Sequence, residues 1–213
     1  MNRALAIPLS ISLLLLATAA RAQVVVVGGG LEERAVRAGE TYSGTLLLRN
    51  QGSQAEEAKL YLTDYSFAAD GTTRYDAPGS QPRSSARWVA FSPSQVRIPP
   101  GGQATVGYTV TVPADAAPGT WWSMLMVEGI AHGSAESTGG AARVRVGIQP
   151  SIRYGVQIAT TLAGPAPKVA FTNARAYAGA GGKVLELDVA NAGEVAYRPE
   201  IRVELFDAAG HKA

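Results

Sequence analysis

Apolar and polar residues alternate with a period of two along much of the chain after residue 23. The longest example covers residues 143–158, RVRVGIQPSIRYGVQI, where every even position is apolar or proline and every odd position is polar or glycine. Such alternation predicts a long β-strand with one apolar face. Pro150 has no backbone N–H to donate within a sheet, so we expect at least this part of the strand to lie at a sheet edge.

Shorter β-rich runs recur before this strand, separated by Gly, Pro, Asn and Asp. They predict strands at 23–27, 41–49, 57–64, 88–92, 104–112, 121–129 and, for the long run, 142–160. Turn residues such as Asn50-Gln51-Gly52 and Asp70-Gly71 lie between them. The pattern predicts an all-β fold in which residues 23–160 form an immunoglobulin-like β-sandwich. We expect its core to include these side chains: Trp88, Phe91, Val106, Tyr108, Val110, Val112, Trp121, Leu125 and Val127.

A second β-rich region follows a segment of linker composition at residues 161–167. Its apolar pattern predicts strands at 168–175, 183–190 and 200–206. Three strands do not close a sandwich. We therefore expect residues 168–213 to form a second, incomplete β-sandwich domain.

The first 22 residues have the features of a secretory signal peptide. Arg3 is followed by an apolar stretch at residues 7–17, and Ala20-Arg21-Ala22 fits a cleavage site. We expect a mature chain that starts at Gln23, lies in the periplasm or outside the cell, and is not inserted in a membrane. The chain has no Cys, so its stability must come from apolar packing without disulfides.

The charge of the chain argues against a nucleic-acid partner. The full sequence has 19 Lys+Arg and 17 Asp+Glu, and cleavage of the predicted signal peptide removes Arg3 and Arg21. The mature chain is then neutral, and its Arg residues are scattered through strands instead of forming a basic patch with stacking aromatics.

Residues that could carry catalysis are few. The two His residues, His132 and His211, lie in small-residue loops, and there is no Cys and no G-x-S-x-G nucleophile motif. We expect neither an enzyme nor a cofactor. Asp64, Asp70 and Asp76 could bind Ca²⁺ together, although Asp-Gly turns account for most of this cluster without a metal.

Two arginines remain as candidate binding residues. Arg153 lies on the polar face of the long strand, near the expected domain junction, and Arg34 lies just before the predicted second strand. If they converge on one cleft, they would suit a carboxylate such as a polypeptide C-terminus. The alternative is that each is a surface Arg paired with a nearby Glu. Trp122 alternates away from Trp121, and we expect it to be exposed or at an interface.

The order of these motifs resembles that of the periplasmic pilus-assembly chaperones of the chaperone–usher pathway. The resemblance lies in residues 34–39 (RAVRAG), 88–93 (WVAFSP), 98–101 (IPPG) and 144–154, and it covers residues 24 to 160 well. It implies that Val144, Val146 and Ile148 form a donor strand. It also implies that Arg34 and Arg153 bind the terminal carboxylate of a pilus subunit, although the second anchor is usually Lys in that family.

The resemblance implies a periplasmic chaperone that caps a fimbrial or pilin subunit by donating its edge strand to the subunit's incomplete immunoglobulin fold. An outer-membrane usher would be a further partner, and without a subunit the edge strand would favour self-association. The alternative is a secreted structural immunoglobulin-like module of a cell-surface assembly, in which the long strand pairs within its own protein.

Overall fold

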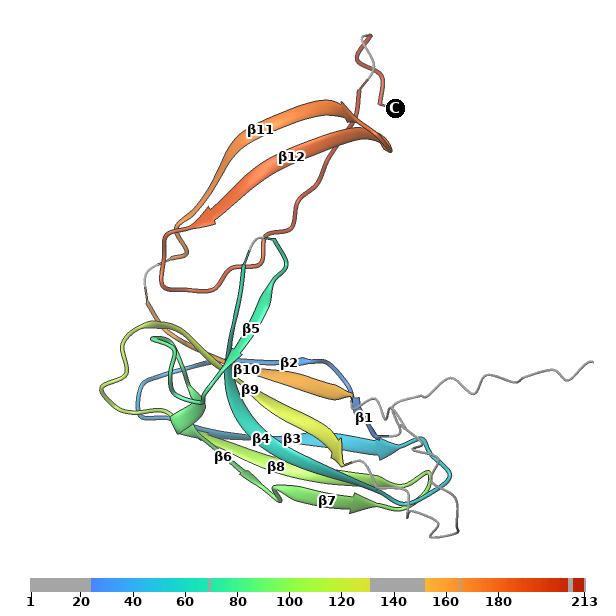
Figure 1. Ribbon diagram of the computed structural model, residues 1–213. Coiled ribbons are helices and arrows are strands. Elements are labelled where there is room, and N and C mark those ends of the chain that lie inside the picture. The colour runs from blue at the N-terminus through green and yellow to red at the C-terminus, as the bar shows by residue number, and fades with distance from the viewer. Residues whose placement is uncertain (1–23, 69, 131–151, 165, 207–208, 213) are drawn as a thin grey trace, which may run out of the picture.

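The computed structural model describes residues 24–68, 70–130, 152–164, 166–206 and 209–212 (Figure 1). Its strands are β1 (Val24–Val27), β2 (Leu31–Val36), β3 (Thr41–Asn50), β4 (Glu56–Phe67), β5 (Thr73–Asp76), β6 (Val89–Ser92), β7 (Gln95–Ile98), β8 (Gln103–Thr111), β9 (Gly119–Ile130), β10 (Arg153–Leu162), β11 (Val169–Gly179) and β12 (Gly182–Asn191). One short 3₁₀ helix, η1 (Ala86–Trp88), precedes β6.

The first unit, β1 to β10, is an immunoglobulin-like sandwich of two sheets in the described residues. One sheet has the strand order β1-β3-β8-β6, and the other has the order β2-β10-β9-β4-β5, with β7 also paired to β4. Alternate residues of each strand point between the sheets, as the period of two requires. The all-β fold class predicted from the sequence is therefore confirmed.

The core lies between the two sheets and consists mostly of Val, Leu and Ile side chains. Val106, Tyr108 and Val110 of β8 are at most 2% exposed, and they pack with Leu125 and Val127 of β9. The other predicted core aromatics, Trp88, Phe91 and Trp121, are partly buried against this cluster. The two tryptophan rings, Trp88 and Trp121, have centroids 4.8 Å apart.

Sequence patterns located most strands of the first unit but missed three short or polar ones. β2, with the sequence LEERAV, has too few apolar residues to show a period of two. β5 and β7 have four residues each and pair only with β4 among the described residues. The described part of the strand predicted at 142–160 corresponds to β10, and its first residues, 142–151, lie outside the described residues. The predicted signal peptide at 1–22 also lies outside them.

The second unit is an antiparallel hairpin of β11 and β12, which stands apart from the sandwich in Figure 1. The predicted strand at 200–206 is not formed in the described chain. Its residues alternate as in a strand, but they have no ladder partner there, and only Phe206 forms an isolated bridge, with Lys212. Alternation of apolar and polar residues favours an extended backbone, but a hydrogen-bonded ladder also requires an adjacent strand.

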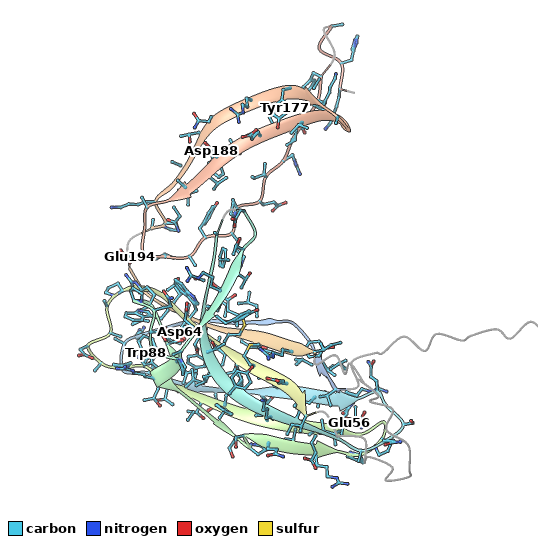
Figure 2. All side chains as sticks on the ribbon, viewed as in Figure 1. Glu56, Asp64, Trp88, Tyr177, Asp188 and Glu194 are labelled. Atoms are coloured by element: carbon cyan, nitrogen blue, oxygen red, sulfur yellow. The ribbon has the colours of Figure 1, made fainter. Side chains whose placement is uncertain are left out.

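The chain that follows β12 returns to the sandwich and is held there by hydrogen bonds. The backbone N–H of Thr120 donates to the carbonyl of Glu194 (2.9 Å), and the Thr120 hydroxyl accepts from the N–H of Ala196 (2.9 Å). Arg83 forms an ion pair with Glu194, which is labelled at this junction in Figure 2. These contacts hold residues 194–196, just after β12, against β9.

No helix in the described ranges is long and apolar enough to cross a membrane.

Candidate functional site

The candidate site is the edge of β10, which loses one of its two neighbours partway along. β9 pairs with β10 over its full length, from Arg153 opposite Glu128 to Leu162 opposite Gly119. β2 pairs in parallel with residues 157–162 only. Within the described chain, residues 153–156 of β10 therefore have a strand on one side and an open edge on the other.

The direction of the free backbone groups follows from one hydrogen bond. The N–H of Gln157 donates to the carbonyl of Gly30 at 2.8 Å, on the β2 side of the strand. Backbone groups of alternate residues point to the same side of a strand. The N–H and C=O of Gly155 and Arg153 therefore point to the side without a paired strand. Gly30 lies close to the Gly155 carbonyl, because a Cβ on Gly30 would be 3.5 Å from that oxygen, so the groups of Arg153 are the more open to an added strand.

The side chains of β10 alternate between the core and the outer face of the sheet. Val156 and Ile158 are at most 2% exposed and belong to the core, and Tyr154 packs partly against it. Ile152, just before β10, is 43% exposed. The apolar face predicted for the long strand is thus confirmed over 154–158, and its upstream residues Val144, Val146 and Ile148 lie outside the described residues.

Arg153 takes part in a small charged cluster on the outer face, beside the open edge. Its Nε lies 3.3 Å from Oε2 of Glu128, and the Lys59 ammonium lies 3.5 Å from the same oxygen. The hydroxyl of Tyr61 donates to this oxygen at 3.0 Å. Burial, and next the hydrogen bond to Glu128, raise the pKa of Tyr61, so the phenol keeps its proton and remains a donor.

Arg34 lies within β2, opposite Thr160 of β10. Its side chain is exposed, and no ion-pair partner for it occurs among the described residues. The charge of Arg34 acts on Tyr42, whose hydroxyl shares a hydrogen bond of 2.6 Å with the Thr160 hydroxyl. Burial raises the pKa of Tyr42, and both the bond to Thr160 and the charge of Arg34 oppose this rise.

The structure does not bring Arg34 and Arg153 together, so the expectation that they face one cleft is wrong. Arg34 is level with Thr160, and Arg153 lies seven residues earlier on β10. At about 3.3 Å per residue this is about 23 Å of strand. Arg153 is also at the end of β10 away from the linker, because β10 runs from Arg153 toward the junction.

The three carboxylates considered for Ca²⁺ accept hydrogen bonds from the protein itself. Asp76, the cross-strand partner of Asp64, accepts from the side-chain amide of Gln81 at 2.8 Å. Asp64 is buried and accepts hydrogen bonds from the Gln81 N–H (2.8 Å) and the Ser84 hydroxyl (2.6 Å). Asp70 accepts from the N–H of Thr72 in an exposed turn. No group of three or more metal-ligating side chains occurs in the part of the chain that the structure describes.

Sequence patterns missed the cluster around Glu128, because its members come from three different strands and meet only through the sheet register. Lys59 and Glu128 are direct cross-strand partners, as are Arg153 and Glu128. Trp122, expected at a surface or interface, lies half-buried on the outer face, and its indole N–H donates to the carbonyl of Tyr65 at 3.2 Å.

No protein-family model and no curated protein sequence matches the chain. Solved structures with a similar fold include the ASH/PapD-like domain 7 of human CEP192, with 15% identity and a TM-score of 0.43 over 75% of this chain and 99% of that one. The CsuC–CsuE chaperone–tip adhesion subunit complex of Acinetobacter baumannii has 13% identity and a TM-score of 0.45, covering 81% and 73%. The YadV chaperone has 12% identity and a TM-score of 0.46, covering 82% and 69%.

Proposed function

We propose that this protein is a periplasmic chaperone that binds a fimbrial or pilin subunit through the open edge of β10. The observation that carries this proposal is the loss of the β2 neighbour at Gln157, which leaves residues 153–156 with free backbone groups on one side. The apolar alternation of the sequence continues upstream of this edge to Val144. This one segment would therefore offer a partner strand both free backbone groups for hydrogen bonds and apolar side chains for packing.

The partner would be an immunoglobulin-like subunit that lacks one strand and so exposes an apolar groove. Val144, Val146 and Ile148 would enter that groove while main-chain hydrogen bonds join the two sheets. Burial of each such side chain stabilises the complex by about 1.5–3 kcal/mol before the cost of ordering the segment. The chemistry needs no cofactor, and an outer-membrane usher would take over the capped subunit.

Of the two arginines, Arg153 suits a terminal carboxylate of the subunit better in this arrangement. It lies next to the open edge, and the neighbouring Lys59 adds a second cation around Glu128. Arg34 would contact the partner only near the junction with the second unit. A carboxylate bound at Arg153 would have to compete with Glu128 for the guanidinium.

The direct test is co-expression of the mature chain with the subunit encoded beside it. Val146→Glu puts a charge into the apolar groove, so we expect the soluble complex to be lost while the free chaperone stays folded. Tyr75→Glu is the matched control, because Tyr75 is 58% exposed on β5, at the opposite edge of the same sheet from β2 and β10. Equal recovery of the complex with Val146→Glu and with the unchanged chain would remove the donor strand from the mechanism.

The role of Arg153 has a separate test. Arg153→Ala is expected to weaken capture of a subunit with a free C-terminus more than capture of the same subunit with an amidated one. Equal losses for both would show that Arg153 does not recognise a carboxylate.

A second candidate is a secreted structural immunoglobulin-like module without chaperone activity. The separation of Arg34 from Arg153 along β10 favours it, because two surface arginines this far apart, of which Arg153 is paired with Glu128, need no common ligand. This candidate predicts that no subunit copurifies with the chain, whichever form of Val146 it carries.

A further inference from the structure

The guanidinium of Arg153 is drawn toward the middle of its sheet and away from the open edge of β10. Its ion-pair partner, Glu128, belongs to β9, and β9 lies on the side of β10 opposite the open edge. Within the described chain, this guanidinium forms no other ion pair and donates no hydrogen bond. A ligand at the open edge would therefore have to take Arg153 from Glu128.

Glu128 is also held by two side chains of β4. The hydroxyl of Tyr61 donates to Oε2 of Glu128 at 3.0 Å, and the ammonium of Lys59 lies 3.5 Å from the same oxygen. Lys59 is the direct cross-strand partner of Glu128, so the sheet register itself keeps these two residues together. The Glu128 carboxylate thus keeps one cation and one hydrogen-bond donor when Arg153 leaves it.

Exposure distinguishes the fixed member of this cluster from the mobile one. The Glu128 side chain is 13% exposed, and a carboxylate at such a position is costly to leave without partners. The Arg153 side chain is 59% exposed and reaches solvent. The carboxylate is therefore the fixed member, and the arginine is the member that can turn to a new partner.

The charges of the cluster leave one cation in excess. Lys59 and Arg153 both face the single carboxylate of Glu128. One carboxylate neutralises one of the two cations, so the other is available to an incoming anion. An exposed ion pair such as that of Arg153 with Glu128 is also weak, which makes its exchange for another carboxylate inexpensive.

We propose that Glu128 is a specificity-determining residue of the β10 site. Glu128 holds Arg153 in the free chain and gives it up to the terminal carboxylate of the bound subunit, while Lys59 and Tyr61 keep Glu128 paired. This exchange rests on the proposed function, because it needs a carboxylate of the subunit at Arg153. A neutral group such as an amide does not displace Glu128, so the exchange favours a charged terminus over a neutral one.

The probe is the subunit encoded beside this chain, immobilised and prepared with either a free or an amidated C-terminus. The mature chain and its variants are titrated against both forms by biolayer interferometry. Glu128→Gln keeps an oxygen that can accept from Tyr61 but removes the charge that holds Arg153. We expect it to tighten binding of the free-terminus subunit about threefold, the size of an exposed ion pair, and to leave binding of the amidated form unchanged.

Lys59→Met tests the exchange itself. It removes the cation that stays with Glu128, and it keeps an unbranched side chain near the Tyr61 ring, whose centroid lies 5.8 Å from the Lys59 ammonium. Glu128 then depends on Arg153 for its charge partner, so binding of the free-terminus subunit should fall about threefold. In the Glu128→Gln background the same substitution should have little effect, because no charge is left to compensate. Equal effects of Lys59→Met in the two backgrounds would overturn the exchange.

Glu57→Gln is the matched control. Glu57 is a second carboxylate of β4, on the same face as Lys59, and its ion-pair partner is Arg97 at 3.7 Å. The substitution removes a negative charge from this face without freeing Arg153, so it should leave the affinity for both forms of the subunit unchanged. An equal gain from Glu57→Gln and Glu128→Gln would overturn the specific role of Glu128.

Failure of this proposal is distinguishable from failure of the proposed function. If Arg153→Ala weakens only the free-terminus subunit and Glu128→Gln brings no gain, Arg153 binds the carboxylate and the exchange with Glu128 is wrong. If Arg153→Ala weakens both forms equally, the exchange is wrong as well, whereas strand donation is judged separately by Val146→Glu.

Discussion

The N–H of Gln157 donates to the carbonyl of Gly30, and this 2.8 Å bond is the last backbone hydrogen bond of β10, among the described residues, with the chain that leads into β2. On one side of Gln157 the strand lies between two neighbours, and on the other it has β9 alone among the described residues. The open edge is thus set by where β2 starts and not by any break in β10 itself.

Amide hydrogen exchange should detect this boundary. The N–H of Gly155 points to the open edge and should exchange quickly, whereas the N–H groups of Val156 and Gln157 are directed at β9 and Gly30 and should be protected. Addition of a strand-donating partner subunit should slow exchange at Gly155 and leave Val156 as it was. Protection of Gly155 in the free protein would mean that the edge is already covered.

The contact between Gly44 and Tyr108 should make Gly44 intolerant of any side chain. The two residues are cross-strand partners, and a Cβ at Gly44 would lie 2.2 Å from the Tyr108 hydroxyl. We expect Gly44→Ala to lower the free energy of unfolding by about 1–3 kcal/mol, as overpacking does. The measurement is urea unfolding followed by tryptophan fluorescence.

Gly107→Ala is the matched control for this test, because Gly107 is on the same strand pair and its Cβ would find its nearest neighbour only at 4.0 Å. It should be neutral or slightly stabilising, since Gly in a strand interior costs backbone entropy. Similar losses for both substitutions would show that Tyr108 is not the cause.

Alkaline pH should destabilise the sandwich through Tyr108. Burial raises the pKa of Tyr108 to about 12, whereas an unfolded tyrosine titrates near pH 10. The folded state holds the proton more tightly, so this contribution to stability is complete below about pH 10 and is lost as the pH rises through about 12. The urea midpoint should fall between about pH 10 and about pH 12, and Tyr108→Phe should reduce that fall.

Asp64 should be a structural residue and not a metal ligand. Its buried carboxylate accepts from Gln81 and Ser84, and Asp64→Asn would turn an amide NH₂ toward one of these donors. We expect a loss of about 1–3 kcal/mol in the free energy of unfolding. Asp70→Asn, in an exposed turn where an amide oxygen can still accept from Thr72, should cost far less. A rise in thermal midpoint on adding Ca²⁺ that Asp64→Asn abolishes would contradict this assignment.

Alternation of apolar and polar residues was enough to predict the fold class and most of the strands of the sandwich. It worked for β3, β8 and β9 because each has one face in the core, so burial leaves a period of two in the sequence. It failed for β2, which is largely exposed at the edge of its sheet and therefore has few apolar residues to mark it. The pattern over residues 200–206 predicted a strand, but in the described part of the chain these residues form no ladder beyond the isolated bridge of Phe206 with Lys212.

The sequence by itself determined which residues of β10 are apolar, that Arg34 and Arg153 are present, and that Asn50 begins a glycine-containing turn. The tertiary structure alone decided which of these residues meet. Strand register places Arg34 level with Thr160 and pairs Arg153 with Glu128, and neither follows from local pattern. The physical reason is that a period of two is fixed within a strand, whereas pairing depends on where a separate strand begins and ends.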